Sequence, residues 1–186
     1  MPTPAAHKTK LSPPPSGLPL PAHRVEESSL APYRAGPDPA SRLGRVADMM
    51  GGRKVLKAAP MSRAEVHALI ETGLPTRSVN VLVAGALLLK SEQMLDAIGI
   101  SLRTYQRFKG NHDGALSSEQ SDRAWRLSEL LVKAAELFGS RQEAERWFDT
   151  PAPALDQKKP ITLMTSSVGA RMVEQLLGRI EHGVYT

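Results

Sequence analysis

Residues 91–109 read SEQMLDAIGISLRTYQRFK and predict a helix, a glycine turn and a second helix. The first helix has an apolar packing face, made by Met94, Leu95, Ala97 and Ile98. Gly99 supplies the turn, because glycine adopts a positive φ without strain. Ile100 is the apolar residue of the turn, and Ser101 is a good N-cap for the second helix. This order is typical of a helix-turn-helix, whose second helix enters the major groove of DNA.

The second predicted helix carries a basic outer face. Leu102, Tyr105 and Phe108 recur at a spacing of three and are expected to face inward, and residues 101–109 contain no acid. Arginine pairs with guanine and glutamine with adenine, whereas serine, threonine and lysine suit phosphates. The residues expected to contact DNA are Ser101, Arg103, Thr104, Gln106, Arg107 and Lys109. The alternative is an ordinary two-helix corner with a solvated basic face.

One such module covers only a few base pairs, so useful affinity calls for a dimer on a two-fold site. A second basic stretch, residues 42–57, is either a short helix or an arm that adds salt-dependent phosphate contacts. The run Leu87-Leu88-Leu89 is either core or dimer interface, and Trp125 and Trp147 are expected to pack between helices.

The surrounding segments also predict helices. Ser62 and Glu65 match a capping box for a helix that stops at Gly73, and residues 79–89 are apolar nearly all round, which favours a buried helix over a buried strand. A long helix is expected from near Ser117 to Gly139, and Ser140 with Glu143 caps a short one. No segment alternates apolar and polar residues with a period of two. We therefore predict an all-α protein.

The last helix is expected from about Ser167 to Glu181, closed by Gly183. Its predicted inward face comprises Val168, Met172, Val173, Leu176, Leu177 and Ile180.

Proline and charge divide the 186 residues into three parts. Ten of the fifteen prolines fall in the first 40 positions. Residues 1–60 carry nine basic and four acidic residues, and this excess equals the net charge of the whole chain, +5. We expect a Pro-rich, basic and largely disordered extension (1–60), a helix-turn-helix domain (61–116) and a small helical domain (117–186). A basic front and a neutral back suit a chain that meets a polyanion at one end and a protein at the other.

Several function classes are disfavoured. The chain has no cysteine, its five histidines show no two-histidine metal spacing, and it has no phosphate loop, GxGxxG or HExxH motif. We therefore expect no enzyme activity, no metal and no cofactor. The longest apolar run, Val81 to Leu89, is too short to cross a bilayer. A cytoplasmic protein, at the nucleoid when bound to an operator, is expected.

The C-terminal third carries an ordered set of residues that is more specific than any one of them. The set comprises Phe138-Gly139-Ser140, Ala144, Trp147, Pro160, Leu163, Gly169, Val173, Leu176 and the closing GRIEHGVY of residues 178–185. Through these residues the chain resembles the Xre/MbcA/ParS antitoxin family, and the resemblance covers about residues 62–186. That family couples a divergent Xre-type helix-turn-helix to a C-terminal toxin-binding domain. The first 60 residues lie outside the resemblance.

The resemblance implies a partner toxin with a RES domain that consumes NAD, an antitoxin C-terminus that lies at the toxin's NAD pocket, dimers, and repression of the operon's own promoter. The residues expected to bind toxin are Arg179, His182, Gly183, Val184, Tyr185 and Thr186. The terminal carboxylate of Thr186 is an anion that a phosphate pocket accepts, and Arg179 and His182 suit acidic partners. The sequence alone favours a frayed terminus for Tyr185 and Thr186, and the resemblance reverses that preference.

Two other functions stay open. One is a stand-alone helix-turn-helix transcription regulator whose C-terminal helices only dimerise. The other is a protein-interaction module with no role on DNA.

Overall fold

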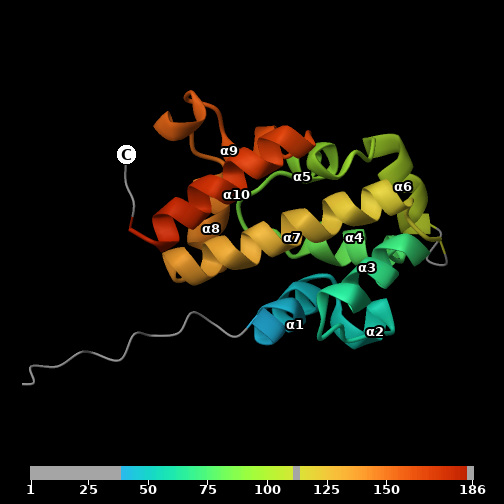
Figure 1. Cartoon of the computed structure of the whole chain (residues 1–186). Coiled ribbons are helices and arrows are strands. Elements are labelled where there is room, and N and C mark those ends of the chain that lie inside the picture. The colour runs from blue at the N-terminus through green and yellow to red at the C-terminus, as the bar shows by residue number, and fades with distance from the viewer. Residues whose placement is uncertain (1–38, 111–113, 184–186) are drawn as a thin grey trace, which may run out of the picture. The chain divides into compact units, whose positions relative to one another are not determined.

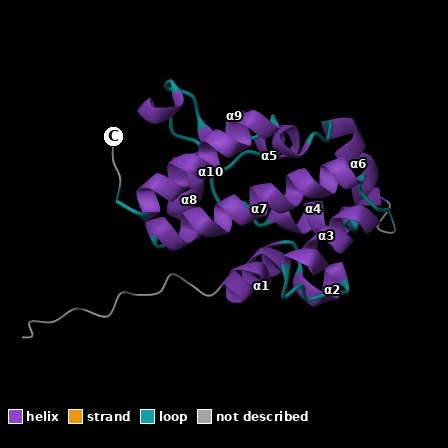
Figure 2. Cartoon of the chain, in the orientation of Figure 1, coloured by secondary structure: helices purple, strands orange, loops and turns teal. Residues whose placement is uncertain are grey.

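The structure is a computed structural model that describes residues 39–110 and 114–183 (Figures 1 and 2). Its elements are α1 (Pro39–Met49), α2 (Gly52–Leu56), α3 (Arg63–Thr72), α4 (Thr76–Ala84), α5 (Ser91–Ile98), α6 (Leu102–Gly110), α7 (Ser118–Phe138), α8 (Arg141–Phe148), the 3₁₀ turn η1 (Pro153–Leu155), α9 (Pro160–Leu163) and α10 (Ser167–Glu181). Within these residues the β structure is limited to two isolated bridges, Pro75–Ala115 and Ala152–Lys158. The prediction of an all-α protein is confirmed.

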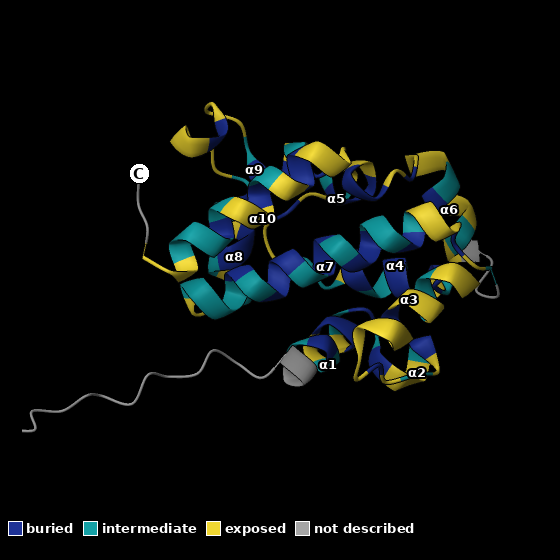
Figure 3. Cartoon of the chain, in the orientation of Figure 1, coloured by how far each residue is buried: buried dark blue, intermediate teal, exposed yellow. Residues whose placement is uncertain are grey.

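Helix α7 is the central element, because α1, α3, α5, α8 and α10 all pack against it. It begins after Ser117, whose hydroxyl accepts the N–H of Gln120 while the Gln120 side chain accepts the N–H of Ser117. It ends at Gly139, which has a φ of +87°. Both ends lie where the sequence predicts them. The apolar face of α7 belongs to one hydrophobic core shared by all these helices (Figure 3).

Residues 39–60 differ from the expected disordered extension. They form α1 and α2, and α1 packs on α7. Leu43, Val46, Ala47 and Met50 recur at helical spacing and are buried, so this segment has an apolar face that the high proline content of the first 40 residues masks. Of the two interpretations of residues 42–57, the helical one is confirmed. The predicted disorder of residues 1–38 concerns a segment outside the described residues.

The apolar stretch 79–89 is helical only in part. The structure confirms a helix over a strand, but α4 ends at Ala84 because Gly85 follows it. Leu89 is buried, whereas Leu87 and Leu88 are 60% and 42% exposed. The expectation of a buried helix to residue 89 is therefore wrong as a helix for residues 85–89, and wrong as burial for Leu87 and Leu88.

Helix α10 has the predicted bounds, but its buried face is rotated from the predicted one. The most buried residues are Gly169, Ala170, Val173 and Leu177, whereas Val168 is 60% exposed and does not face inward. The reason is the close approach of α9: a Cβ on Gly169 would overlap the carbonyl oxygen of Leu163. Small residues therefore bring α10 against α9, and Val168 lies on the opposite side of the helix.

No helix in the described ranges is both long and apolar enough to cross a membrane.

Candidate nucleic-acid interface and C-terminal domain

The turn between α5 and α6 has the geometry that the sequence predicts. Gly99 ends α5 with a φ of +79°, and the N–H of Ile100 donates to the carbonyl of Leu95 over 2.9 Å. Ile100 itself is 2% exposed, so the turn is fixed to the core. All four residues of the predicted α5 packing face, Met94, Leu95, Ala97 and Ile98, are buried. The structure thus confirms a helix-turn-helix over residues 91–110.

Helix α6 starts on a capped end. The Ser101 hydroxyl accepts the N–H of Thr104 over 3.2 Å and donates to the Thr104 hydroxyl over 2.9 Å. Tyr105 is buried and Phe108 is half-buried, as expected. Leu102 is 49% exposed, which corrects the prediction that it faces inward. It occupies the first position of α6, before the helix meets the core at Tyr105.

The basic residues of α6 lie on its solvent face. Arg103, Gln106, Arg107 and Lys109 are exposed, and Thr104 is half-buried. The Lys109 ammonium lies 4.9 Å from the centre of the Tyr105 ring, a cation–π distance. Burial raises the pKa of Tyr105, so this ring stays neutral beneath the lysine. The ion pairs among the described residues include neither Arg103 nor Arg107, which leaves both guanidinium groups available to a ligand. Their contact with DNA stays a prediction.

The predicted toxin-binding residues cluster at the end of α10. Arg179 is half-buried, and His182 and Gly183 are exposed. The N–H of His182 donates to the carbonyl of Gly178, and Gly183 turns the chain with a φ of +67°. Val184, Tyr185 and Thr186 lie outside the described residues. The structure therefore brings three of the six predicted residues together and does not describe the other three.

Glu181 fixes this end of α10 to the rest of the protein. Its carboxylate lies 3.0 Å from the Lys133 ammonium of α7 and 3.7 Å from the Arg42 guanidinium of α1. The hydrogen bond from Lys133 holds the pKa of Glu181 below its ordinary value, against the opposing effect of burial. The carboxylate thus stays ionised and joins α1, α7 and α10.

Glu145 is a structurally central residue that the sequence analysis misses. Its side chain, on α8, is fully buried. One carboxylate oxygen accepts the backbone N–H groups of Leu87, Leu88 and Leu89 over 2.7, 2.7 and 3.2 Å, and the other accepts Nε–H of Arg141 over 2.8 Å. The burial of Glu145 could have been predicted from its position, because it lies between Ala144 and Phe148 on the apolar stripe of α8.

Two opposing effects act on the pKa of Glu145. Burial raises it, but the hydrogen bonds from the Leu88 N–H, the Arg141 side chain and the N–H groups of Leu87 and Leu89 outweigh burial and hold it below its ordinary value. The group is therefore a buried carboxylate anion.

Asp149 makes a second link between α8 and the helix-turn-helix. It accepts a hydrogen bond from the Gln93 side chain of α5 over 2.8 Å and another from the Lys159 ammonium over 2.9 Å. Both bonds lower the pKa of Asp149 below its ordinary value, and the bond from Gln93 has the larger effect. Together, Glu145 and Asp149 attach the loop before α5, and α5 itself, to the C-terminal part of the chain.

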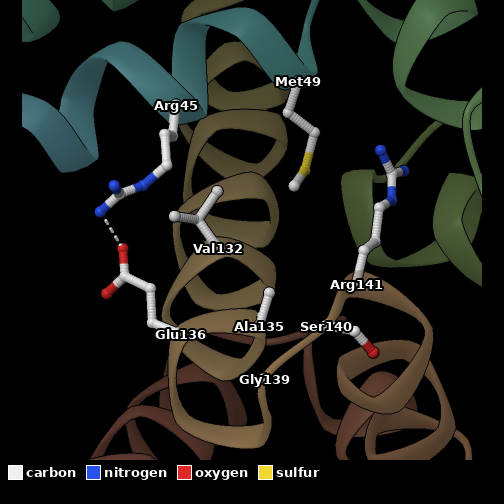
Figure 4. A pocket seen from close by; sticks show the side chains of 8 residues that line it. All are labelled: Arg45, Met49, Val132, Ala135, Glu136, Gly139, Ser140 and Arg141. Carbon is white, nitrogen blue, oxygen red and sulfur yellow. Dashed lines mark hydrogen bonds and ion pairs between the residues drawn. The ribbon is translucent and has the colours of Figure 1, made fainter.

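A pocket of about 410 Å³ lies between α1, α7 and the turn into α8 (Figure 4). The Arg45–Glu136 ion pair stands on one side of it and Arg141 on another, with Met49 and Val132 between them. Within the described ranges, no three His, Asp or Glu residues gather as a metal site would require. The pocket thus has charged walls but, among the described residues that line it, no cluster of metal-ligating side chains.

Comparison with known families gives two matches on this chain. Residues 65–129 match the antitoxin Xre-like helix-turn-helix domain, and residues 133–183 match the antitoxin Xre/MbcA/ParS C-terminal toxin-binding domain. The first match contains α4, α5 and α6, and the second runs from the last turns of α7 to Gly183.

Three curated relatives carry the name antitoxin Xre. One from Yersinia enterocolitica is 36% identical over 95 residues, which is 50% of this chain and 64% of the relative. One from Photorhabdus laumondii is 29% identical over 124 residues (66% and 82%), and one from Pseudomonas putida is 29% identical over 119 residues (64% and 72%). The chain thus spans just under two thirds of the Yersinia relative.

Proposed function

The chain belongs to the Xre/MbcA/ParS family of antitoxins, and on this premise we propose that it neutralises a RES-domain toxin that degrades NAD and represses its own operon. The observation that carries the proposal is the pairing of a helix-turn-helix match with a toxin-binding match on one chain, at residues 65–129 and 133–183. The first supplies a DNA-binding element and the second a protein-binding one.

In the toxin-binding role, the end of α10 enters the toxin's NAD pocket. The exposure of His182 and Gly183 supports this, because the chain leaves α10 at the protein surface. Arg179 and His182 pair with acidic groups at the rim of the pocket, while residues 184–186 fill it and exclude NAD. The toxin is inhibited without any chemical change in the antitoxin.

In the DNA-binding role, α6 enters the major groove. Arg103 and Arg107 lie one helical turn apart on its exposed face, so both reach neighbouring base pairs. Two copies of the chain bind a two-fold operator, since a single helix contacts too few bases for specific binding. The dimer is part of the proposal.

The test is coexpression of this chain with the small reading frame beside its own gene, with cellular NAD as the readout. The full chain should protect the cells and copurify with the neighbour's product. Deletion of residues 184–186 should restore NAD loss. The matched control is the full chain with Arg103→Ala and Arg107→Ala, which should protect as well as the unaltered chain.

Unchanged protection by the shortened chain would reject the pocket-filling mechanism. Absence of any copurifying partner would instead favour the stand-alone transcription regulator.

A further inference from the structure

Four of the five cations in residues 42–57 form two groups of different character. Arg42 and Arg45, on α1, are both paired with Glu136 of α7, Arg42 through Nη2 at 2.6 Å. Lys54 of α2 and Lys57, which caps it, are exposed and make no ion pair with the residues that the structure describes. The first pair serves the fold, whereas the charges of Lys54 and Lys57 remain available.

These two lysines share a pocket with a third cation. Lys54, Lys57 and Arg77 line a hollow of about 400 Å³ whose other walls are Val55, Gly73, Pro75, Gly114 and Ala115. We call it the basic pocket. None of the described residues that line it is acidic, so three like charges gather there. Such an arrangement attracts anions and is suited to a phosphate group.

The backbone adds two features to the basic pocket. Arg77 lies in the first turn of α4, and Pro75, directly before that helix, also lines the hollow, so the N-terminus of α4 lies at its edge. Lys57 caps α2 in the left-handed conformation, with a φ of +55° and its N–H bonded to the carbonyl of Arg53 over 3.1 Å. Residues with a side chain rarely adopt this conformation, which glycine adopts freely. A lysine at this position is thus not explained by backbone stability.

The basic pocket is connected to α6 through α4. Helix α4 packs against both α2 and α6, and Gly114 of the pocket follows the last residue of α6 by four positions. In Figure 1, α2 and α6 lie at the right of the picture, and the C-terminal end of α10 lies at the left. Lys54 and Lys57 precede both family matches, which begin at residues 65 and 133. Arg77 lies inside the first match, so the two lysines are the charged residues of the basic pocket that fall outside it.

We propose that the basic pocket binds a backbone phosphate of the same DNA duplex that α6 contacts. The inference rests on the proposed DNA-binding role. A phosphate contact strengthens binding to every sequence alike and makes it more sensitive to salt, whereas base contacts by α6 set the preference for one sequence. The basic pocket thus contributes affinity, and α6 contributes specificity.

The experiment measures affinity by fluorescence anisotropy across a salt series. The probes are a labelled duplex from the DNA immediately upstream of this chain's reading frame and a duplex of scrambled sequence. Lys54→Gln with Lys57→Gly removes two charges, and the glycine suits the φ at position 57. Adding Arg77→Gln removes the third. Because the basic pocket binds one phosphate, the double variant should lower the magnitude of the slope of log K against log salt by up to about 0.9, and the triple variant by about 0.9 in all.

The matched control removes two exposed cations elsewhere, Lys158→Gln with Arg171→Gln, and should leave the slope unchanged. Circular dichroism confirms that every variant is folded. The ratio of affinities for the two duplexes should be the same in the basic-pocket variants as in the unaltered chain. If the unaltered chain binds and the triple variant keeps its slope, the basic pocket has no DNA role while the proposed function stands. If the unaltered chain binds neither duplex, the DNA-binding role fails and this inference fails with it.

Discussion

The buried carboxylate of Glu145, in the segment that matches the toxin-binding domain, accepts the backbone N–H of Leu88, in the segment that matches the helix-turn-helix, over 2.7 Å. The same oxygen also accepts the N–H groups of Leu87 and Leu89. The loop that leads into α5 is therefore ordered by a residue 56 to 58 positions further along the chain. The position of the first helix of the helix-turn-helix depends on a side chain of the other segment.

Replacing Glu145 with glutamine should destabilise the protein by about 3 kcal/mol, since it removes one partner of a buried charge pair and leaves Arg141 uncompensated. Urea unfolding followed by circular dichroism measures this change. The matched control is Glu143→Gln on the same helix, whose exposed pair with Arg146 should contribute less than about 1 kcal/mol. Equal effects of the two changes would contradict a special role for Glu145.

The stability of the protein should fall in acid, partly through Glu145. Its pKa is lower in the folded than in the unfolded chain, so the unfolded chain binds more protons between the two values. The contribution is fully present above the pKa of the unfolded chain, about 4.3, and is lost as the pH falls through the folded value. The free energy of unfolding at pH 3 to 7 should therefore rise more steeply with pH in the unaltered chain than in Glu145→Gln. Parallel curves would contradict this account.

Gly169→Ala should destabilise the protein by about 2 kcal/mol, because the added methyl group overlaps the backbone of Leu163 and forces α10 away from α9. Thermal unfolding measures the effect. Gly178→Ala in the same helix is the matched control. Its nearest neighbour is the Lys133 ammonium at 3.8 Å, so the better helix propensity of alanine should raise stability by up to about 1 kcal/mol. A neutral Gly169→Ala would show that α9 and α10 can separate without cost.

Arg103→Ala and Arg107→Ala should each weaken binding to the upstream duplex by about tenfold or more, as expected for the loss of one base contact. Unlike changes in the basic pocket, they should also reduce the preference for that duplex over a scrambled one. Copurification of the partner protein should persist. Retained preference after both substitutions would mean that another element reads the sequence.

The parts of this fold that the sequence predicts are those that local hydrogen bonds determine. Ser62, Ser101, Ser117 and Ser140 each cap a helix through the N–H three residues later, so a window of four residues contains the whole signal. The glycine turn at Gly99 is equally local. These signals are sufficient to locate the helix-turn-helix and the start of α7.

The parts that the sequence does not predict depend on contacts between distant residues. Arg42 and Glu136 are 94 positions apart, and no local pattern indicates that α1 is paired with α7. The failure of the helix to continue past Gly85 is similar, since the Glu145 carboxylate accepts the N–H groups of Leu87, Leu88 and Leu89, which a longer helix would use internally. The basic pocket is not predicted from the sequence either, because Lys54, Lys57 and Arg77 come together only when the chain folds.

The two family matches meet inside α7, between residues 129 and 133, and no loop separates them. An α-helix advances 1.5 Å and turns about 100° with each residue. A single residue gained or lost at this junction would swing one half around the other by more than a quarter turn and break the Glu145–Leu88 contact. The two matched domains can therefore be recombined with those of other proteins only if the number of residues along α7 stays the same.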